Sequence, residues 1–497
     1  MSLATGAGAA DRWGRQDDSS GRLTVGGVGG LVGALGLAAL VAGLPIEVMP
    51  GVVGGAMLLV GIVVSPIVGL YALLVAIPFS PTFGIEDASF SISAFEPLAT
   101  LLLLFWLGRG VIRREIALPR GGLFGALFGL LVVLLIAAGQ AWSFPLALKE
   151  TLKWVLLVVA FIITGACVRG ERAIRGLLAA LLLAGAGQAF MGVVQFAAGF
   201  GPPTFAIGGF MRAHGNFGQP NPFAGYLGTI LPLAVMMATI PHPGRFRAIT
   251  TGSAAVIGLG IVLSMSRGAW LGLMISFAVM ALVWGPRTRR LVVPTVAASL
   301  VFVALALMGV LPPILANRVT SVTNNFGVFD VRQVELTPEN FAVVERMAHW
   351  QAGWEMFVDE PLLGVGPGNY PAVYEAYYIR PWREPLGHAH NYYLNMAAEA
   401  GLTGLFALLV VLFLAFRTLL RRYRAIGRPD MVHDAGLDAP PRPSGALSRP
   451  FARALAVGLL GSLVVVCTHN LFDNLLVHGV GIQIGILLGL IGGVTTR

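Results

Sequence analysis

Long runs of apolar residues recur along almost the whole chain, and they constrain its fold more than any other feature. A straight helix needs ~20 residues to cross the hydrocarbon core of a bilayer, and several of the runs are shorter than that. Only 11% of the residues are charged, whereas a soluble domain carries about 25%. The candidate spans cover residues 23–44, 48–64, 67–79, 90–107, 123–141, 152–168, 177–200, 223–240, 249–265, 269–284, 291–311, 392–416, 454–472 and 477–494.

Runs of this kind exclude a soluble enzyme, and also an outer-membrane barrel, whose strands alternate in short segments. We predict an all-α, polytopic transmembrane helical bundle of about 12–14 spans with a large, partly helical outer loop. The break at Ser65-Pro66 fits either two short tilted helices or one broken helix. Cys167 and Cys467 each lie within an apolar run and are interpreted as small apolar residues.

The basic residues fall on alternate connections between the runs. With the N-terminus inside, the inner segments carry 24 Lys and Arg against 8 Asp and Glu, and the outer segments carry 9 against 16. The inner side is then net +16 and the outer side net −7, which sum to the +9 of the chain. An excess of basic residues marks the cytoplasmic side of a membrane protein. The basicity therefore reports topology and does not indicate a nucleic-acid partner.

This orientation divides the chain into six parts. Loops longer than ~12–15 residues are usually functional or disordered, and the long outer loop is rich in aromatic residues, which favours a folded structure. The long inner segment is rich in Arg, Pro, Gly and Asp, which is typical of a flexible linker. The parts are a cytoplasmic tail (1–22), a transmembrane region of about 11 spans (23–311), the outer loop (312–389), a span that opens with histidines (390–416), a cytoplasmic linker (417–453) and two C-terminal spans (454–497).

Five basic side chains near the outer boundary are candidates for binding a diphosphate. A guanidinium fork matches two phosphate oxygens, and positive charge on this side stands against a net acidic background. Each residue also has a structural interpretation, as an interfacial anchor or a surface charge. The candidates are Arg212, Arg267, Arg346, Lys149 and Lys153.

Two of these arginines occupy informative positions. Arg267 lies between two apolar runs with almost no loop, where an arginine is costly unless it faces a polar cavity or a partner. Arg346 borders the apolar stripe of a predicted amphipathic helix. We expect that stripe to consist of Val343, Met347, Trp350, Trp354 and Phe357.

Histidines at the end of the outer loop are candidates for acid–base chemistry. His388 and His390 precede the run 392–416, close to the membrane yet accessible to water, and histidine suits a general base. The alternative is a structural or metal-binding pair, for which zinc would need a third ligand. His469 and Asp473 are spaced i,i+4, so the carboxylate could orient that imidazole.

Other familiar catalytic patterns do not occur in the sequence. It contains no Asp-x-Asp, no phosphate-binding P-loop and no Gly-x-Ser-x-Gly, so we predict neither a metal site nor a cofactor. The glycine-rich segment at 364–368 follows no predicted strand, and we interpret it as a turn after a helix.

Several segments together resemble the O-antigen ligase-like family. The family's signature is His, then Asn, Ser or Gln, two residues, Leu, six residues and Gly, and it is met here from His390-Asn391 through Leu394 to Gly401. Further resemblance lies in residues 266–269, in Arg346 followed by Trp350, in residues 361–369 and, more weakly, in residues 469–473.

The resemblance implies a bacterial inner-membrane glycosyltransferase with its site on the outer, periplasmic face. Such enzymes take a glycan from undecaprenyl diphosphate and join it to a sugar hydroxyl, without a metal and with inversion. The acceptor is lipid A core for a ligase, or another lipid-linked repeat for a polymerase, and the shared motifs do not separate the two. The implied base is His390, with supporting roles for His388, Asn391, Glu399, His469 and Asp473. Glu399 lies about 13 Å further along the helix, so we assign it a structural or orienting role.

Two other classes of protein are alternatives. A lipid-linked oligosaccharide flippase or other transporter would carry charged groups in mid-membrane helices and inverted repeats. A membrane sensor or scaffold would leave Arg267, Arg346 and His390 without a common purpose. We therefore expect a glycosyltransferase.

Overall fold

The computed structural model describes residues 49–80, 82–84, 91–114, 118–119, 121–285, 330–337, 340–427 and 447–494, with the single positions 301, 305, 308 and 310. The predicted tail 1–22, the run 23–44 and most of the run 291–311 lie outside these residues, as do parts of the outer loop and of the inner linker. The chain divides into two compact units, Met1–Val60 and Gly61–Arg497, and the site described below lies within the second.

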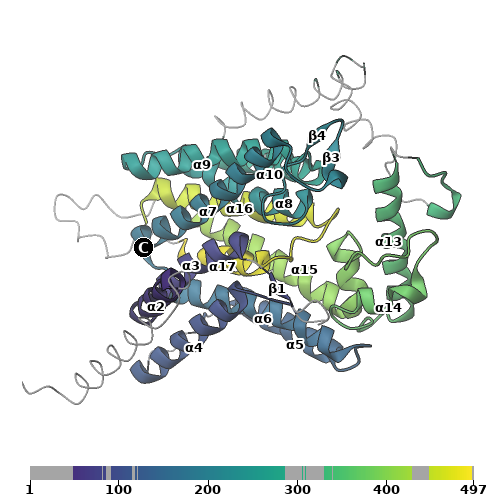
Figure 1. Ribbon diagram of the computed structural model, residues 1–497. Helices are drawn as coiled ribbons and strands as arrows, with labels where there is room; N and C mark the ends of the chain where they lie inside the picture. Colours follow the sequence, from purple (N-terminus) through teal and green to yellow (C-terminus); the bar gives the residue numbers. More distant parts are fainter. Residues whose placement is uncertain are drawn as a thin grey trace, which may run out of the picture. The chain divides into compact units, whose positions relative to one another are not determined.

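The described part of the chain is almost entirely helical (Figure 1), which confirms the predicted all-α, polytopic membrane protein. Among the described residues, seven helices are long and apolar enough to cross a membrane. They are α4 (Phe95–Arg113), α7 (Gly170–Ala198), α8 (Pro220–Ala238), α9 (Gly244–Leu263), α10 (Arg267–Trp284), α15 (Tyr392–Gly427) and α16 (Arg449–His469). Shorter apolar helices are α2 (Met49–Val64), α3 (Pro66–Phe79), α5 (Gly122–Ala138) and α17 (Val480–Gly493), and α6 (Phe144–Cys167) bears charges in its first half.

Extended structure in the described residues is limited to two short hairpins. β1 (Thr82–Gly84) pairs antiparallel with β2 (Ser91–Ser93), and β3 (Ala206–Ile207) with β4 (Phe210–Met211). β2 occupies part of the run 90–107, so the prediction of a helix from residue 90 was wrong at its start. Glu96 accepts the Ser93 N–H at 2.8 Å, a capping interaction that fixes the first turn of α4 after the hairpin.

Helices α8 and α16 form the buried centre of the second unit. Almost every residue of both is buried, and glycines bring the two backbones close together. A Cβ added at Gly458 would lie 3.0 Å from Leu233 Cα, and one at Gly228 would lie 3.1 Å from a Val465 methyl. Small residues allow this approach where no hydrophobic effect drives helices together in lipid.

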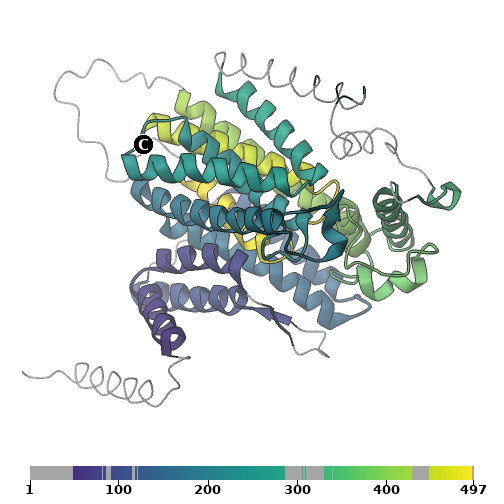
Figure 2. The same cartoon turned by 45° about the horizontal axis from the view of Figure 1, so that its top comes forward.

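The arginine-rich helix ends gather at one end of this unit. Arg453, at the start of α16, donates to Trp284 O at the end of α10 and to Tyr423 Oη on α15. Arg422 donates to Gly492 O at the end of α17, at 2.7 Å. Helices α13 (Phe341–Asp359) and α14 (Tyr370–Tyr377) lie at the opposite end (Figures 1 and 2). The bundle therefore has one basic end and one end that carries the outer loop.

Helix α15 is broken at Gly401, whose φ of 64° and ψ of −165° belong to a region that essentially only glycine adopts. A short helix (392–400) precedes the break, and a long one follows it to Gly427, beyond the expected end of the run 392–416. Leu402 N–H, just after the break, donates to Pro361 O at 2.8 Å.

The break also leaves helix carbonyl groups without an intrahelical partner, and the glycine-rich turn before α14 uses them. Val365 N–H donates to Ala398 O and Gly366 N–H to Glu399 O, both at 2.9 Å. The turn has no room for a side chain, because a Cβ at Gly364 would lie 2.5 Å from Ala398 O. The segment is thus a turn after α13, as the sequence indicated, and it fastens α14 to α15.

The buried face of α13 matches the expected stripe only in part: Met347 is buried and Trp350 is partly buried. Trp354 is 56% exposed, while Val344, Ala348, Ala352 and Met356 are buried. The large aromatic residues of the expected stripe stay at the margin, because α14 and the histidine segment pack closely on small residues of this helix. A Cβ at Gly353, for example, would lie only 3.2 Å from Ala389 Cβ.

We predict that Gly401→Ala strongly lowers the midpoint of thermal unfolding in detergent. A Cβ there would lie 2.2 Å from the Leu362 carbonyl carbon, and the backbone conformation alone would cost roughly 1–3 kcal/mol. The control is Gly258→Ala in α9, where the added methyl group meets open space, so the midpoint should stay or rise slightly. Equal midpoints for the two variants would contradict the described break.

Candidate functional site

Two histidines at the end of the outer loop meet one carboxylate from the connection between α16 and α17. Asp473 Oδ1 lies 3.7 Å from His388 Nε2 and 3.6 Å from His390 Nδ1. Both distances exceed the ~2.7–3.2 Å of a hydrogen bond, and catalytic contacts are often long until substrate binds. His388, His390 and Asp473 are termed the His-His-Asp group. The sequence had singled out the two histidines and the aspartate in separate segments, without indicating that they meet.

The backbone fixes the proton of His388. His390 N–H donates to His388 Nδ1 at 3.0 Å, so a neutral His388 carries its proton on Nε2, facing Asp473. The ring of His390 turns its Nδ1 to the same carboxylate. At 3.6 Å from Asp473, His390 Nδ1 is not within hydrogen-bond distance, and both ring nitrogens are buried without a hydrogen-bond partner among the described residues. A proton on Nδ1, facing the carboxylate, would leave the Nε2 lone pair available. A base oriented by an acidic group is the arrangement that activates hydroxyl nucleophiles.

The charges of the group follow from burial and mutual contact. Burial would raise the pKa of the Asp473 carboxyl, but the facing His390 and His388 outweigh this and hold the pKa below its usual range. Burial, followed by the charge of His390, lowers the pKa of His388 to about 4. At neutral pH, an ionised carboxylate and a neutral His388 therefore face the His390 ring.

The backbone at His390 is strained and firmly held. Its φ of 53° is left-handed, which is uncommon for a residue with a side chain. Trp350 Nε1–H donates to its carbonyl at 3.3 Å, and Tyr392 N–H donates to Asn470 O at 2.8 Å. Such strain persists only where surrounding contacts over-determine it, and it clusters at functional sites.

Two predicted supporting residues bind backbone groups. Asn391 Oδ1 accepts the N–H groups of Tyr393 and Leu394, both at 3.1 Å, which caps the short helix. Glu399 is buried and accepts the Tyr370 N–H at 3.1 Å, at the first turn of α14. Both side chains thus position elements that carry the site.

His469 links the His-His-Asp group to α8 and α10. A methyl group at Gly225 would lie 3.1 Å from its Nε2, and one at Gly268 would lie 3.9 Å from its Nδ1. Its carbonyl accepts the Asp473 N–H at 3.1 Å. The Asp473 carboxylate makes its close contacts with the other two histidines, so it is turned away from the pairing with His469 that the i,i+4 spacing suggested.

The three predicted arginines lie on different elements, and Arg346 is the one whose charge is seen to act on the histidines. Arg346 on α13 lies near enough for its charge to act on His388 and His469, and its Nε is buried without a hydrogen-bond partner in the described part of the chain. Arg267 is the first residue of α10, directly before the glycine beside His469. Arg212 donates to Ser264 O, at the turn that leads into α10, at 2.7 Å.

The predicted lysines lie on α6. Lys153 pairs with Glu150, and its charge also acts on Glu399 and His388. Lys149 precedes Lys153 by one helical turn. Lys153 therefore borders the same group of titratable residues, with part of its charge already balanced.

Sequence reasoning missed His349, which lies behind His390. It is buried, its Nδ1 lies 3.0 Å from Tyr370 Oη, and its ring stacks on Tyr374 with centroids 4.9 Å apart. Its ring also meets His390 edge to face, at 5.5 Å. Its position three residues after Arg346 places it near the same face of α13, and this was the signal available.

The His-His-Asp group also has the composition of a metal site. One donor atom from each residue lies within 4.8 Å of the other two. However, a histidine that binds a metal through Nε2 normally donates a proton from Nδ1, whereas His388 Nδ1 accepts the His390 N–H. The observed hydrogen bond therefore fits a proton-bearing Nε2 better than a ligand, and the absence of a metal stays a prediction.

Comparison with known families adds a separate observation. Residues 252–409 match a family model described as O-antigen ligase. This region of the chain is similar to the O-antigen ligase family. No curated protein matches the chain. The O-antigen ligase region includes Arg267, Arg346, His388 and His390, and Asp473 lies beyond its end. Together with the membrane helices, it supports a membrane glycosyltransferase-type role.

We predict that the stability of the protein falls as pH is lowered from about 6.5 towards 4. Burial, together with the charges of His390 and His388, lowers the pKa of His349 to about 3, and His388 shifts in the same direction. The unfolded chain then binds more protons than the folded one, so acid favours unfolding.

His349→Phe should flatten this dependence of the thermal midpoint on pH, because it removes one buried group that resists protonation. Tyr370→Phe is the matched control, since it loses the same hydrogen bond but leaves the histidine in place. An unchanged slope in His349→Phe would show that His349 titrates normally.

Proposed function

We propose that the protein is a membrane glycosyltransferase of O-antigen ligase type. It transfers a glycan from undecaprenyl diphosphate to a sugar hydroxyl on the outer, periplasmic face of the bacterial cytoplasmic membrane. The observation that carries this proposal is His390: Asp473 lies 3.6 Å from its Nδ1, and its Nε2 is buried and unpartnered among the described residues. The family match at 252–409 supports the same class of chemistry.

In this proposal His390 activates the acceptor. A sugar hydroxyl is a poor nucleophile at neutral pH, and its attack is easier if the proton is removed in the transition state. Nε2 of His390 takes that proton while the acceptor oxygen forms its bond to the anomeric carbon. Asp473 stabilises the resulting imidazolium through Nδ1–H. His388, neutral and protonated on Nε2, supports the carboxylate from its other side.

In the same proposal, the arginines bind the diphosphate leaving group. The bond between the anomeric carbon and the diphosphate oxygen breaks, and its electron pair stays on the diphosphate. Arg267 and Arg346 neutralise the negative charge that develops there, and Arg212 and Lys153 add to the local positive potential. A diphosphate is already a good leaving group, so the proposed reaction needs no metal. A single displacement inverts the anomeric centre.

Transfer is favoured over transport of the lipid-linked glycan. The His-His-Asp group lies where the segment after α14 meets the connection after α16, whereas Arg453 lies at the start of α16, at the other end of that helix. A lipid-linked donor places its phosphates at the membrane boundary with its tail in the bilayer. Lipid A core as acceptor makes the protein a ligase, and a second lipid-linked repeat makes it a polymerase with the same donor chemistry.

We predict that His390→Asn lowers turnover by roughly 10²–10⁴ while binding of the lipid-linked donor stays nearly intact. Asparagine tolerates the left-handed backbone at this position, so the change removes the base without adding strain. Transfer would be followed with purified undecaprenyl-diphosphate-linked glycan and acceptor, before and after treatment with EDTA.

His478→Asn is the matched control for this variant. His478 also has a left-handed φ, of 50°, but lies outside the His-His-Asp group, and its variant should keep normal turnover. Full turnover in His390→Asn, or loss of wild-type activity in EDTA, would contradict the proposed chemistry.

We further predict that Arg267→Lys and Arg346→Lys each impair transfer despite keeping the charge. Lysine loses the bidentate fork, and removing one donor from a developing oxyanion typically costs ~10²–10³ in rate. Arg332→Lys serves as control, because this arginine is exposed on the outer loop and pairs with Glu355. Normal donor affinity and turnover in both site variants would exclude a phosphate clamp.

A further inference from the structure

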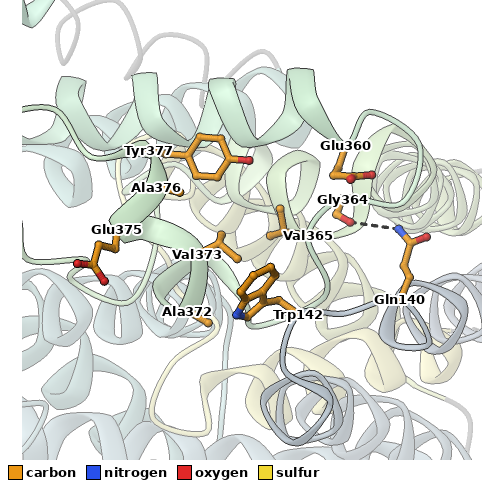
Figure 3. A pocket seen from close by; sticks show the side chains of 10 residues that line it. All are labelled: Gln140, Trp142, Glu360, Gly364, Val365, Ala372, Val373, Glu375, Ala376 and Tyr377. Atoms are coloured by element: carbon orange, nitrogen blue, oxygen red, sulfur yellow. Dashed lines mark hydrogen bonds between the residues drawn. The ribbon is translucent and has the colours of Figure 1, made fainter.

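A cavity of about 620 Å³ lies on the other side of α14 from the His-His-Asp group. Its walls come from the turn between α5 and α6, the glycine-rich turn after α13, and α14 itself (Figure 3). Ala372, Val373 and Ala376 of α14 face this cavity, while Tyr370 and Tyr374 of the same helix pack against the His349 ring. The volume lies within the ~300–1,000 Å³ typical of small-molecule sites.

An aromatic side chain lines the cavity. Trp142 is 78% exposed, yet its backbone is firmly held, since its N–H donates to Val365 O at 3.3 Å. Figure 3 shows its ring beneath Val365 and Val373, with Tyr377 opposite. An exposed indole face beside a concave site offers a platform on which a ligand ring can stack.

The turn that carries Trp142 is clamped on both sides of it. Gln140 Nε2–H donates to Gly364 O at 3.2 Å. Ser143 N–H donates to Asn369 Oδ1 at 2.6 Å, and Asn369 Nδ2–H returns a bond to Ser143 O at 3.2 Å. The floor of the cavity is therefore organised before any ligand binds.

The polar groups of the cavity carry negative charge. Glu360 and Glu375 line it, Tyr377 donates to the adjacent Asp359 at 2.9 Å, and neither Lys nor Arg is among the lining residues. Phosphates, uronic acids and anionic lipid headgroups are repelled by such a site. Carboxylates and an amide beside an aromatic face instead suit a ligand with many hydroxyl donors and an apolar ring face.

We propose that this cavity binds one or two uncharged pyranose residues, with Trp142 stacking on a sugar ring and Glu360 and Glu375 accepting its hydroxyl groups. The site is separated from His390 by about one helix diameter, ~10 Å, so it holds sugars away from the reacting bond. That these sugars belong to the glycan being transferred or extended rests on the proposed function. Binding energy gained at such a distance helps to position the reacting groups.

The test measures sugar binding without any transfer reaction. Full-length protein in nanodiscs is titrated with N,N′-diacetylchitobiose, and separately with glucuronic acid, by saturation-transfer NMR. We expect saturable binding of the neutral disaccharide and at least ~10-fold weaker binding of the anionic sugar. Trp142→Ala should abolish the neutral binding, and Trp142→Phe should keep part of it. Phe144→Ala, which removes an exposed aromatic two residues further on and outside the cavity, should keep all of it.

Glu375→Gln is a second variant that tests the site even if Trp142→Ala fails to fold. It removes one exposed charge, so it should bring the affinity for glucuronic acid closer to that for the neutral sugar. Absence of saturable disaccharide binding in the wild type, equal binding of both sugars, or full binding in Trp142→Ala would overturn the inference. These outcomes are independent of the His390→Asn result. Sugar binding that survives together with full turnover in His390→Asn would refute the proposed mechanism alone.

Discussion

The packing of α13 and α14 depends on how the broken helix α15 satisfies its backbone hydrogen bonds. At Gly401 the helix α15 changes direction, and carbonyl groups that an intact helix would pair are left over. The glycine-rich turn supplies N–H groups from Val365 and Gly366 to two of them. Because unpaired backbone groups near lipid are costly, this docking is close to obligatory. It fixes α14 against the start of α15, and with it both the histidine segment and the floor of the sugar cavity.

The His-His-Asp group brings together ionisable side chains whose burial costs free energy. A buried carboxylate is tolerated only when cations or hydrogen-bond donors face it, and Asp473 has two imidazoles in that place. The His390 N–H holds the first ring as an acceptor, which directs the proton of that ring towards the carboxylate. The backbone at His390 is strained, and among the described residues its Nε2 is buried without a hydrogen-bond partner. Main-chain contacts thus fix the ring in the way that the proposed base requires.

Much of the architecture could be predicted from the sequence. The apolar runs and the alternation of arginine-rich connections gave the helical membrane fold and its two unlike ends, since both are local properties of the chain. The family-like motif indicated His390 as a candidate base, and His388 and Asn391 beside it as supporting residues. Two predictions failed for identifiable reasons. Residues 91–93 pair with β1 as a short strand before α4. On α13, Met347 is buried as expected, but Ala348 and Ala352 are buried where Trp354 was expected, because another helix packs closely there.

The sequence by itself determined which residues are costly near a membrane, and therefore where function should be sought. It did not determine the partners of those residues. Asp473 is four residues from His469, yet the fold turns its carboxylate to His388 and His390, which are distant in sequence. Trp142 and Glu375 likewise meet only because the turn between α5 and α6 docks on the glycine-rich segment. Helices form from local hydrogen bonds and apolar spacing, whereas these groupings depend on how helix ends pack together, which only the tertiary structure decides.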